Sequence, residues 1–177
     1  MATAYVLVNC SMGSEKNIIS SLNAIDGVVE SHGTLGLYDI VAKVESDKED
    51  GIQDIVTGTI RKMPKIHSTM TLTRSESEEL FRPSEKIASA TLGRNSTQAY
   101  VVIHTKKRKE YGVLRSLSHI HEVKEADVVF GFYDVLCKVE ASEYQTLEKV
   151  ITKAIRTLPD IQRSMTLNVI TEQEQPA

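Results

Sequence analysis

The stretch GLYDIVAKVE, residues 36–45, occurs a second time as GFYDVLCKVE at residues 131–140. Sliding the chain on itself so that these stretches coincide also places Tyr5 on Tyr100. No gap is needed between residues 5 and 73, and roughly a third of the aligned positions are identical. One register held over so long a span indicates an internal repeat. We therefore interpret the chain as two copies of one domain.

The repeat divides the chain into four segments. We place the first domain at residues 1–73, a polar linker with a possible short helix at 74–98, the second domain at 99–170 and a disordered tail at 171–177. Each domain has about 70 residues, and a domain of this size buries only a modest core. We therefore expect the two copies to cover each other's exposed sheet faces as an intrachain pseudo-dimer.

Each copy alternates short β-branched stretches with amphipathic helical stretches. In the first copy the strands are predicted at residues 5–9, 28–35, 38–45 and 66–73. One helix is predicted at about 15–25, and a second follows Ser46 or Asp47 and ends at Met63-Pro64. The order βαββαβ is the ferredoxin-like α+β arrangement of the dimeric α+β barrel type, with both helices on one face of an antiparallel sheet.

Alternation along the strands predicts which side chains lie on each sheet face. The face toward the helices is predicted to carry Val6, Val8, Ile40, Val44, Met70 and Leu72. The open face is predicted to carry Tyr5, Leu7, Asn9, Val41, Lys43, Thr69 and Thr71, and in the second copy Tyr100, Val102, His104, Leu136, Lys138, Ser164 and Thr166. This mixture suits an interface or a cavity better than open solvent.

The composition excludes several classes of protein. The net charge of −3 is unlike that of a general polyanion binder, so we expect no direct DNA binding. Cys10 and Cys137 occupy different positions of the repeat, which favours free thiols in a reducing cytoplasm over a disulfide framework. No apolar run approaches the roughly 18 residues of a membrane span, and no signal peptide is evident.

We predict no catalytic, cofactor or metal site. The five histidines have no Cys or carboxylate spacing that would complete a metal site, although an ion across an oligomer interface stays open. No Ser/His/Asp order, phosphate loop or nucleotide fingerprint is present. The charge run Lys106–Lys109 occurs only in the second copy, and we interpret it as a solvated loop rather than an anion or DNA site.

The two hairpins and the segments that follow them resemble the effector-binding (RAM) domain of the Lrp/AsnC transcription regulators. The resemblance rests on Gly36-Leu37-Tyr38-Asp39 with Met63-Pro64-Lys65-Ile66, and on Gly131-Phe132-Tyr133-Asp134 with Leu158-Pro159-Asp160-Ile161. The family has a glycine after the proline, where this chain has Lys65 and Asp160, so this turn is expected to differ. The resemblance covers most of both copies.

The resemblance implies a stand-alone prokaryotic regulatory module without a helix-turn-helix domain. In the family, domains pair through their sheets, the pairs form larger rings, and amino-acid effectors bind between pairs near the hairpin. This implies a homo-oligomer that binds a small effector, with Lrp-like regulators as further partners. Fusing two domains in one chain raises their effective concentration and lets the halves diverge.

The candidate ligand-binding residues lie in the hairpins and the last strand of each copy. The glycines satisfy a tight turn and also let a ligand approach the backbone. The aspartates either hold an ammonium group or bond their own turn, and the hydroxyls either bind a ligand or are ordinary strand residues. The full set is Gly36, Leu37, Tyr38, Asp39, Thr69, Thr71, Gly131, Phe132, Tyr133, Asp134, Ser164 and Thr166.

Two other functions stay open at this point. One is an assembly or adaptor protein without a ligand of its own. The other is an enzyme of the dimeric α+β barrel type with a cavity beneath its sheets. Its candidate residues are Asn9 with Tyr5, or His104 with Tyr100.

Overall fold

The computed structural model describes residues 1–75, 81 and 96–170. Within them the chain forms two compact units, one built on Met1–Arg74 and the other on Ser75–Asn168. The short helix predicted in the linker and the disordered tail predicted at 171–177 lie outside the described residues. Each unit is described by itself.

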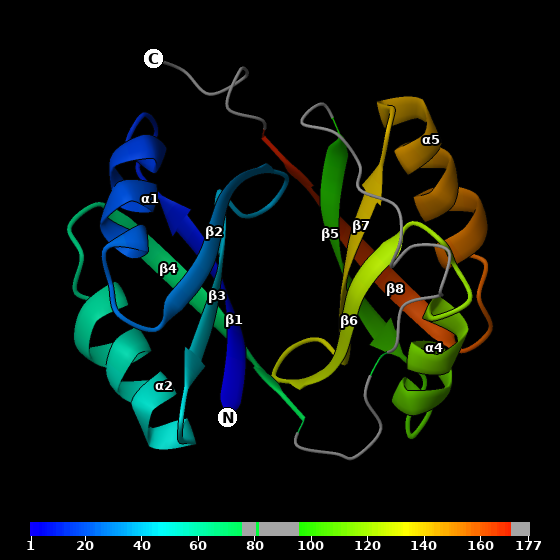
Figure 1. Ribbon diagram of the computed structural model, residues 1–177, viewed down its shortest axis with the longest axis horizontal. Coiled ribbons are helices and arrows are strands. Elements are labelled where there is room, and N and C mark those ends of the chain that lie inside the picture. Colours follow the sequence, from blue (N-terminus) through cyan, green and yellow to red (C-terminus); the bar gives the residue numbers. More distant parts are fainter. Residues whose placement is uncertain (76–80, 82–95, 171–177) are drawn as a thin grey trace. The chain divides into compact units, whose positions relative to one another are not determined.

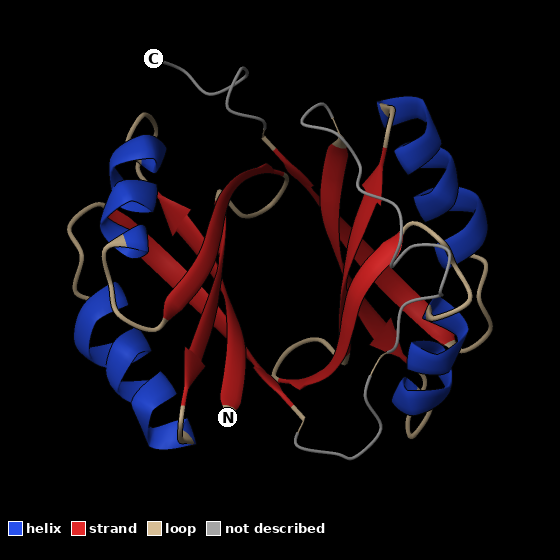
Figure 2. Ribbon diagram, viewed as in Figure 1, coloured by secondary structure: helices blue, strands red, loops and turns tan. Residues whose placement is uncertain are grey.

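The first unit is a four-stranded antiparallel sheet with its helices on one face (Figures 1 and 2). β1 pairs with β3 and with β4, and β2 pairs with β3, so the strand order is β4-β1-β3-β2. The elements follow along the chain as β1 (Ala2–Cys10), α1 (Glu15–Asn23), β2 (Val28–Leu35), β3 (Ile40–Ser46), α2 (Glu49–Ile55), η1 (Val56–Ile60) and β4 (Ile66–Arg74).

The second unit repeats this arrangement with the strand order β8-β5-β7-β6. The tandem βαββαβ prediction is therefore confirmed, while the packing of the two units as a pseudo-dimer stays a prediction. The elements are β5 (Thr97–Thr105), α4 (Glu110–Leu117), β6 (Val123–Phe130), β7 (Val135–Ala141), α5 (Tyr144–Lys149), η2 (Val150–Ile155) and β8 (Ile161–Val169).

Each unit has its own core between helices and sheet. In the first unit Ile18 and Leu22 of α1 and Ile52 of α2 meet the apolar row of β1 and β3. Because helical spacing brings positions three and four apart to one face, the helices present a continuous apolar stripe to the sheet. The row on the sheet consists of Ala4, Val6, Val8, Ile40, Ala42 and Val44.

The predicted faces are right for β1 and β3 and wrong for β4. Tyr5 lies opposite Lys43 in the register, and the Lys43 ammonium is 5.9 Å from the centre of the Tyr5 ring, away from the helices. Leu72 pairs with Tyr5 and therefore shares this face, whereas Thr71 pairs with Val6 of the core. Met70 and Leu72 on one face and the β-branched Thr69 and Thr71 on the other can each pack against helices. The sequence of β4 alone therefore does not show which face lies toward the helices.

The second unit shows the same shift in its last strand. Leu167 pairs with Tyr100 on the open face, and Thr166 pairs with Val101, which belongs to the core beneath the helices. Thr69, Thr71, Ser164 and Thr166 therefore lie on the helix side of their sheets rather than on the predicted open side.

The second helix of each unit ends in a wide turn that the sequence pattern does not predict. α2 continues directly into η1 and α5 into η2, and both continuations are π-helical. The Arg61 N–H donates to the Val56 carbonyl at 2.9 Å, and the Arg156 N–H donates to the Ile151 carbonyl at 3.0 Å. These bonds span five residues instead of four, so the backbone is locally widened.

The turn after each proline keeps a glycine-like backbone without a glycine. Lys65 has φ 74° and Asp160 has φ 73°, both in the left-handed region. The Lys65 carbonyl accepts a 2.8 Å bond from the Ser11 N–H, and the Asp160 carbonyl accepts an equal bond from the Lys106 N–H. These bonds tie the turn to the end of the first strand in each unit, which holds the uncommon conformation in place.

Cys137 lies on β7 within the core of the second unit and is fully buried. Burial raises the pKa of its thiol to about 12 from an ordinary value of 9.0. The unfolded chain would therefore lose this proton above about pH 9, while the folded chain keeps it until about pH 12.

We expect the free energy of unfolding to fall above pH 9 by about 1.4 kcal/mol per pH unit through this thiol alone. Below pH 9 both states hold the proton and the thiol has no effect. Urea unfolding of the wild type and of Cys137→Ala at pH 8, 9 and 10 measures this difference. The first copy has Ala42 at the same position, so the variant residue fits this fold. Equal slopes in the two proteins would contradict the prediction.

Candidate functional site

The predicted hairpins connect β2 to β3 and β6 to β7. Gly36 has φ 152° and Gly131 has φ 141°, so each turn uses backbone that side chains disfavour, as predicted. The neighbours Leu37 and Phe132 are 74% and 64% exposed, which leaves both hairpin tips accessible within their units.

The hairpin aspartates fasten each hairpin to the end of the first strand of the unit. The Asp39 carboxylate accepts a 2.9 Å hydrogen bond from the Cys10 N–H, and the Asp134 carboxylate accepts an equal bond from the Thr105 N–H. Neither bond goes to the aspartate's own turn, so the local alternative was wrong. The Asp134 side chain is 43% exposed, so it combines a structural bond with an accessible charge.

The hairpin tyrosines lie over the open faces of the sheets. The Tyr38 hydroxyl lies 3.8 Å from the Met70 sulfur, and the Tyr133 hydroxyl lies 3.8 Å from the Met165 sulfur. The same contact in both units fixes each tyrosine ring beside the hairpin. The hairpin residues therefore form one group on the open side.

The hydroxyl residues of the last strands do not join this group. Thr69 pairs with Val8 on the helix side, where its hydroxyl accepts a 3.0 Å bond from Arg61 Nε. Tyr38 contacts Met70, which points to the opposite side of the same strand. The structure therefore divides the predicted ligand residues into two separate places, the hairpin on one side and Thr69, Thr71, Ser164 and Thr166 on the other.

The hairpin of the second unit carries an aromatic cluster that the first lacks. The His104 ring stacks on Tyr133 at 4.5 Å and meets Phe132 edge-on at 5.0 Å. His104 Nδ1 lies 3.9 Å from the Asp134 carboxylate. The first unit has Asn9 in place of His104 and Leu37 in place of Phe132, so the two hairpins offer different surfaces.

Sequence reasoning missed Arg61 and Arg156, which follow the wide turns. Arg156 donates from Nε to Ser164 Oγ at 3.2 Å and from Nη2 to Thr166 Oγ1 at 3.4 Å. Both arginines could have been identified as candidate site residues from the sequence, because they occupy the same position of the repeat and the residue type is kept.

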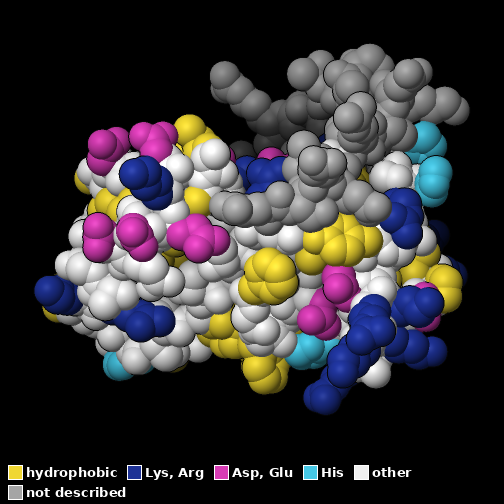
Figure 3. Space-filling view, turned by 90° about the horizontal axis from the view of Figure 1, so that it is seen from below, with side chains coloured by type: hydrophobic (Ala, Val, Ile, Leu, Met, Phe, Trp, Pro, Cys, Tyr) yellow, Lys and Arg dark blue, Asp and Glu magenta, His cyan; other side chains and the backbone are white. Residues whose placement is uncertain are grey.

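The basic run Lys106–Lys109 is exposed throughout, in agreement with a solvated loop. Figure 3 shows Lys and Arg side chains gathered in a dense group on one face of the molecule. Lys109 precedes α4, and Glu110 occupies the first turn of this helix, where a carboxylate complements the helix dipole.

Within residues 1–75, 81 and 96–170, no three His, Cys, Asp or Glu side chains gather in a way that could hold a metal ion. No helix in the same residues is both long enough and apolar enough to cross a membrane.

Comparison with known proteins places both units in one family. The family model described as the Lrp/AsnC ligand binding domain matches the chain twice, at residues 3–77 and 98–175. None of the curated proteins matches the chain.

Three solved structures illustrate the range of similarity. FFRP-DM1 is 35% identical over 42% of this chain and 100% of its own, with a TM-score of 0.42. AsnC of E. coli is 20% identical over 71% of this chain and 72% of its own, with a TM-score of 0.42. The siroheme decarboxylase NirDL is 9% identical over 94% of this chain and 70% of its own, with a TM-score of 0.67. At this low identity the likeness to NirDL concerns the fold alone.

Proposed function

Because the chain belongs to the family of Lrp/AsnC ligand-binding domains, we propose that it is a regulatory module whose small effector is an amino acid bound at the hairpins. Binding would act by changing the assembly of the chain with itself or with Lrp-like regulators. Such coupling requires the effector to bind one assembly state more tightly than another. The proposal includes no chemical step and no DNA contact by this chain.

The observation that carries the proposal is the accessible carboxylate of Asp134 beside the aromatic rings of the second hairpin. A carboxylate is the natural partner of an ammonium group, and the faces of aromatic rings also attract cations. The Thr105 N–H and the stacked His104 and Tyr133 rings fix this arrangement. An α-amino group therefore fits this place better than a purely anionic ligand does.

We also propose a cytoplasmic location, supported by the two free thiols Cys10 and Cys137. Burial of both side chains protects them, and neither forms part of a disulfide framework. Fractionation of the native host cells would test this location directly.

We expect thermal unfolding in the presence of each of the twenty amino acids, at millimolar concentration, to show a rise of a few degrees for one or a few of them. A ligand that binds only the folded state stabilises it in proportion to the logarithm of its concentration. Native mass measurements with and without the active amino acid would then report the change of assembly.

The matched variants are Asp134→Asn and Asp39→Asn, each compared with its own unliganded melting temperature. Loss of the shift on changing either aspartate supports the hairpin as the effector site. A flat response of the wild type to all twenty amino acids would overturn the amino-acid proposal and favour the adaptor function.

A further inference from the structure

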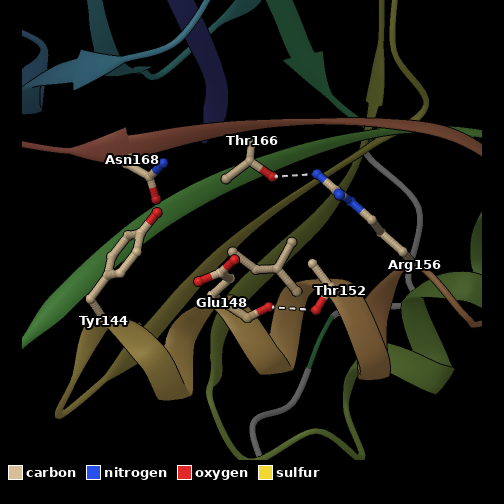
Figure 4. A pocket seen from close by; sticks show the side chains of 7 residues that line it. Tyr144, Glu148, Thr152, Arg156, Thr166 and Asn168 are labelled. Atoms are coloured by element: carbon tan, nitrogen blue, oxygen red, sulfur yellow. Dashed lines mark hydrogen bonds between the residues drawn. The ribbon is translucent and has the colours of Figure 1, made fainter.

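We propose that the second unit holds another ligand site, between the helix α5–η2 and the strand β8, on the side of the sheet opposite to the hairpin tyrosine. The ligand class is a small molecule with a carboxylate at one end and an ammonium at the other. The side chains that line this site are drawn in Figure 4.

The site is an open cavity of about 190 Å³ in the second unit. One wall is a stripe of the helix, because residues four apart lie one above another on a helix surface. The opposite wall is the helix side of β8, and Ile151 adds an aliphatic surface. The stripe consists of Tyr144, Glu148, Thr152 and Arg156, and the strand supplies Thr166 and Asn168.

Arg156 is held in position to receive an anion. Its two bonds to Ser164 and Thr166 go to neutral hydroxyls and orient the guanidinium along the strand. A guanidinium has five N–H donors, so further donors are left for a carboxylate. Within the part of the chain that the structure describes, no carboxylate forms an ion pair with Arg156. A ligand carboxylate would therefore add a charge-assisted bond without displacing an existing ion pair.

The wide turn η2 supports this reading of Arg156. The turn ends at Ile155, immediately before Arg156, and it includes Ile151 of the cavity wall. An i→i−5 turn is rare in proteins and is found frequently at functional sites. Here the widened backbone lies directly before the arginine that donates to the hydroxyls of β8.

Glu148 supplies the opposite charge in the same cavity. It lies eight residues before Arg156, about 12 Å along the helix axis, so the two side chains occupy different ends of the stripe. Among the described residues the Glu148 carboxylate has no cationic partner. Figure 4 shows the Tyr144 and Asn168 side chains pointing toward each other near this end. A ligand that carries both charges would satisfy both ends at once.

The first unit provides a comparison, because it keeps the arginine but has no acid at the position of Glu148. Arg61 corresponds to Arg156 and bonds Thr69, but Gln53 stands in place of Glu148. Glu49 replaces Tyr144, and Thr73 replaces Asn168. The paired charges two turns apart are thus a property of the second unit, which makes the first unit an internal control.

The test uses 6-aminohexanoate as the probe, with hexanoate and hexylamine as single-charge controls. The full chain is labelled with ¹³C at its isoleucine methyl groups, and the Ile151 signal is followed during titration. We expect 6-aminohexanoate to shift the Ile151 signal with an affinity at least tenfold higher than that of hexanoate or hexylamine. Failure to shift this signal at tens of millimolar probe, or equal affinity for all three probes, would overturn the proposal.

Substitutions at Arg156 and at Glu148 test the contribution of each charge to binding separately. Arg156→Gln is expected to weaken binding at least tenfold, whereas Arg61→Gln leaves it unchanged. Glu148→Gln introduces the residue of the first copy and is expected to abolish the preference for 6-aminohexanoate over hexanoate. If Arg156→Gln fails to fold, Arg156→Lys keeps the charge but loses the two-pronged geometry, and weaker binding is again expected. Full binding by Arg156→Gln or Arg156→Lys would overturn the assignment.

The proposal of an effector site at the hairpin and the proposal of a site between α5–η2 and β8 can be contradicted independently. Asp134→Asn alters the proposed effector site and is expected to leave the 6-aminohexanoate titration unchanged. If Asp134→Asn abolished this titration too, the probe would be binding at the hairpin, and the second site would be overturned. A flat amino-acid panel together with an Ile151 response would instead overturn only the hairpin proposal.

Discussion

Replacing Leu22 with alanine is expected to lower the free energy of unfolding of the first unit by about 2–5 kcal/mol. Leu22 lies on α1 with no exposed surface, and it packs in the core between helix and sheet. The substitution removes buried methyl groups and leaves a cavity that the surrounding β-strands can fill only partly, since they are fixed by their ladder hydrogen bonds.

Urea unfolding followed by circular dichroism measures this loss, and hydrogen exchange assigns it to one unit. Leu117 is the same position of the repeat and is also fully buried, so Leu117→Ala should affect the second unit by a similar amount. Met12 is 97% exposed, and Met12→Ala should change stability by less than about 0.5 kcal/mol. A loss below about 1 kcal/mol for Leu22→Ala would show that α1 is not anchored by this core.

Replacing Asp39 with alanine is expected to destabilise the first unit by about 1–3 kcal/mol. The substitution removes the acceptor of the Cys10 N–H, which then has no partner at the end of β1. The same carboxylate joins the hairpin to β1 across 29 positions of the chain, and the backbone bond from the Asp39 N–H to the Val8 carbonyl remains in the variant.

The variant Asp39→Asn separates the hydrogen bond from the charge, because an amide oxygen accepts the same bond. We expect Asn to retain most of the stability that Ala loses. Hydrogen exchange at the Cys10 amide should be much faster in Asp39→Ala than in Asp39→Asn. Equal losses in the two variants would show that the negative charge, rather than the acceptor, stabilises this strand end.

Most of the fold follows from features that are local in the sequence. The second strand was predicted at residues 28–35, where β2 lies, because turn residues limit it at both ends. The repeat then transferred every element to the second copy. The last strand was assigned to the wrong faces because Met70 and Leu72 are apolar and yet point away from the helices. Where both faces of a strand carry residues that can be buried, alternation shows which residues share a face but not which face points to the helices.

The candidate site was harder to predict than the fold, since its contacts join distant parts of the chain. The glycines could be assigned, because a tight hairpin needs the backbone that Gly36 and Gly131 adopt. The bond from Cys10 to Asp39 could not, since nothing local indicates which strand end a carboxylate will meet. Arg156 was not predicted because the wide turn rotates the residues that follow it relative to the apolar face of the preceding helix.

The wide turns also limit which changes of helix length this fold can accept. Val56 and Ile151 are the same position of the repeat, and both accept the five-residue bond that closes the turn. The same bond at the same repeat position shows that both units close this helix with one geometry. Deleting one residue from either turn would rotate the helix relative to the following segment by about 100° and move the arginine away from its strand. Both units therefore depend on the same helix length to bring the arginine to the hydroxyls of the last strand.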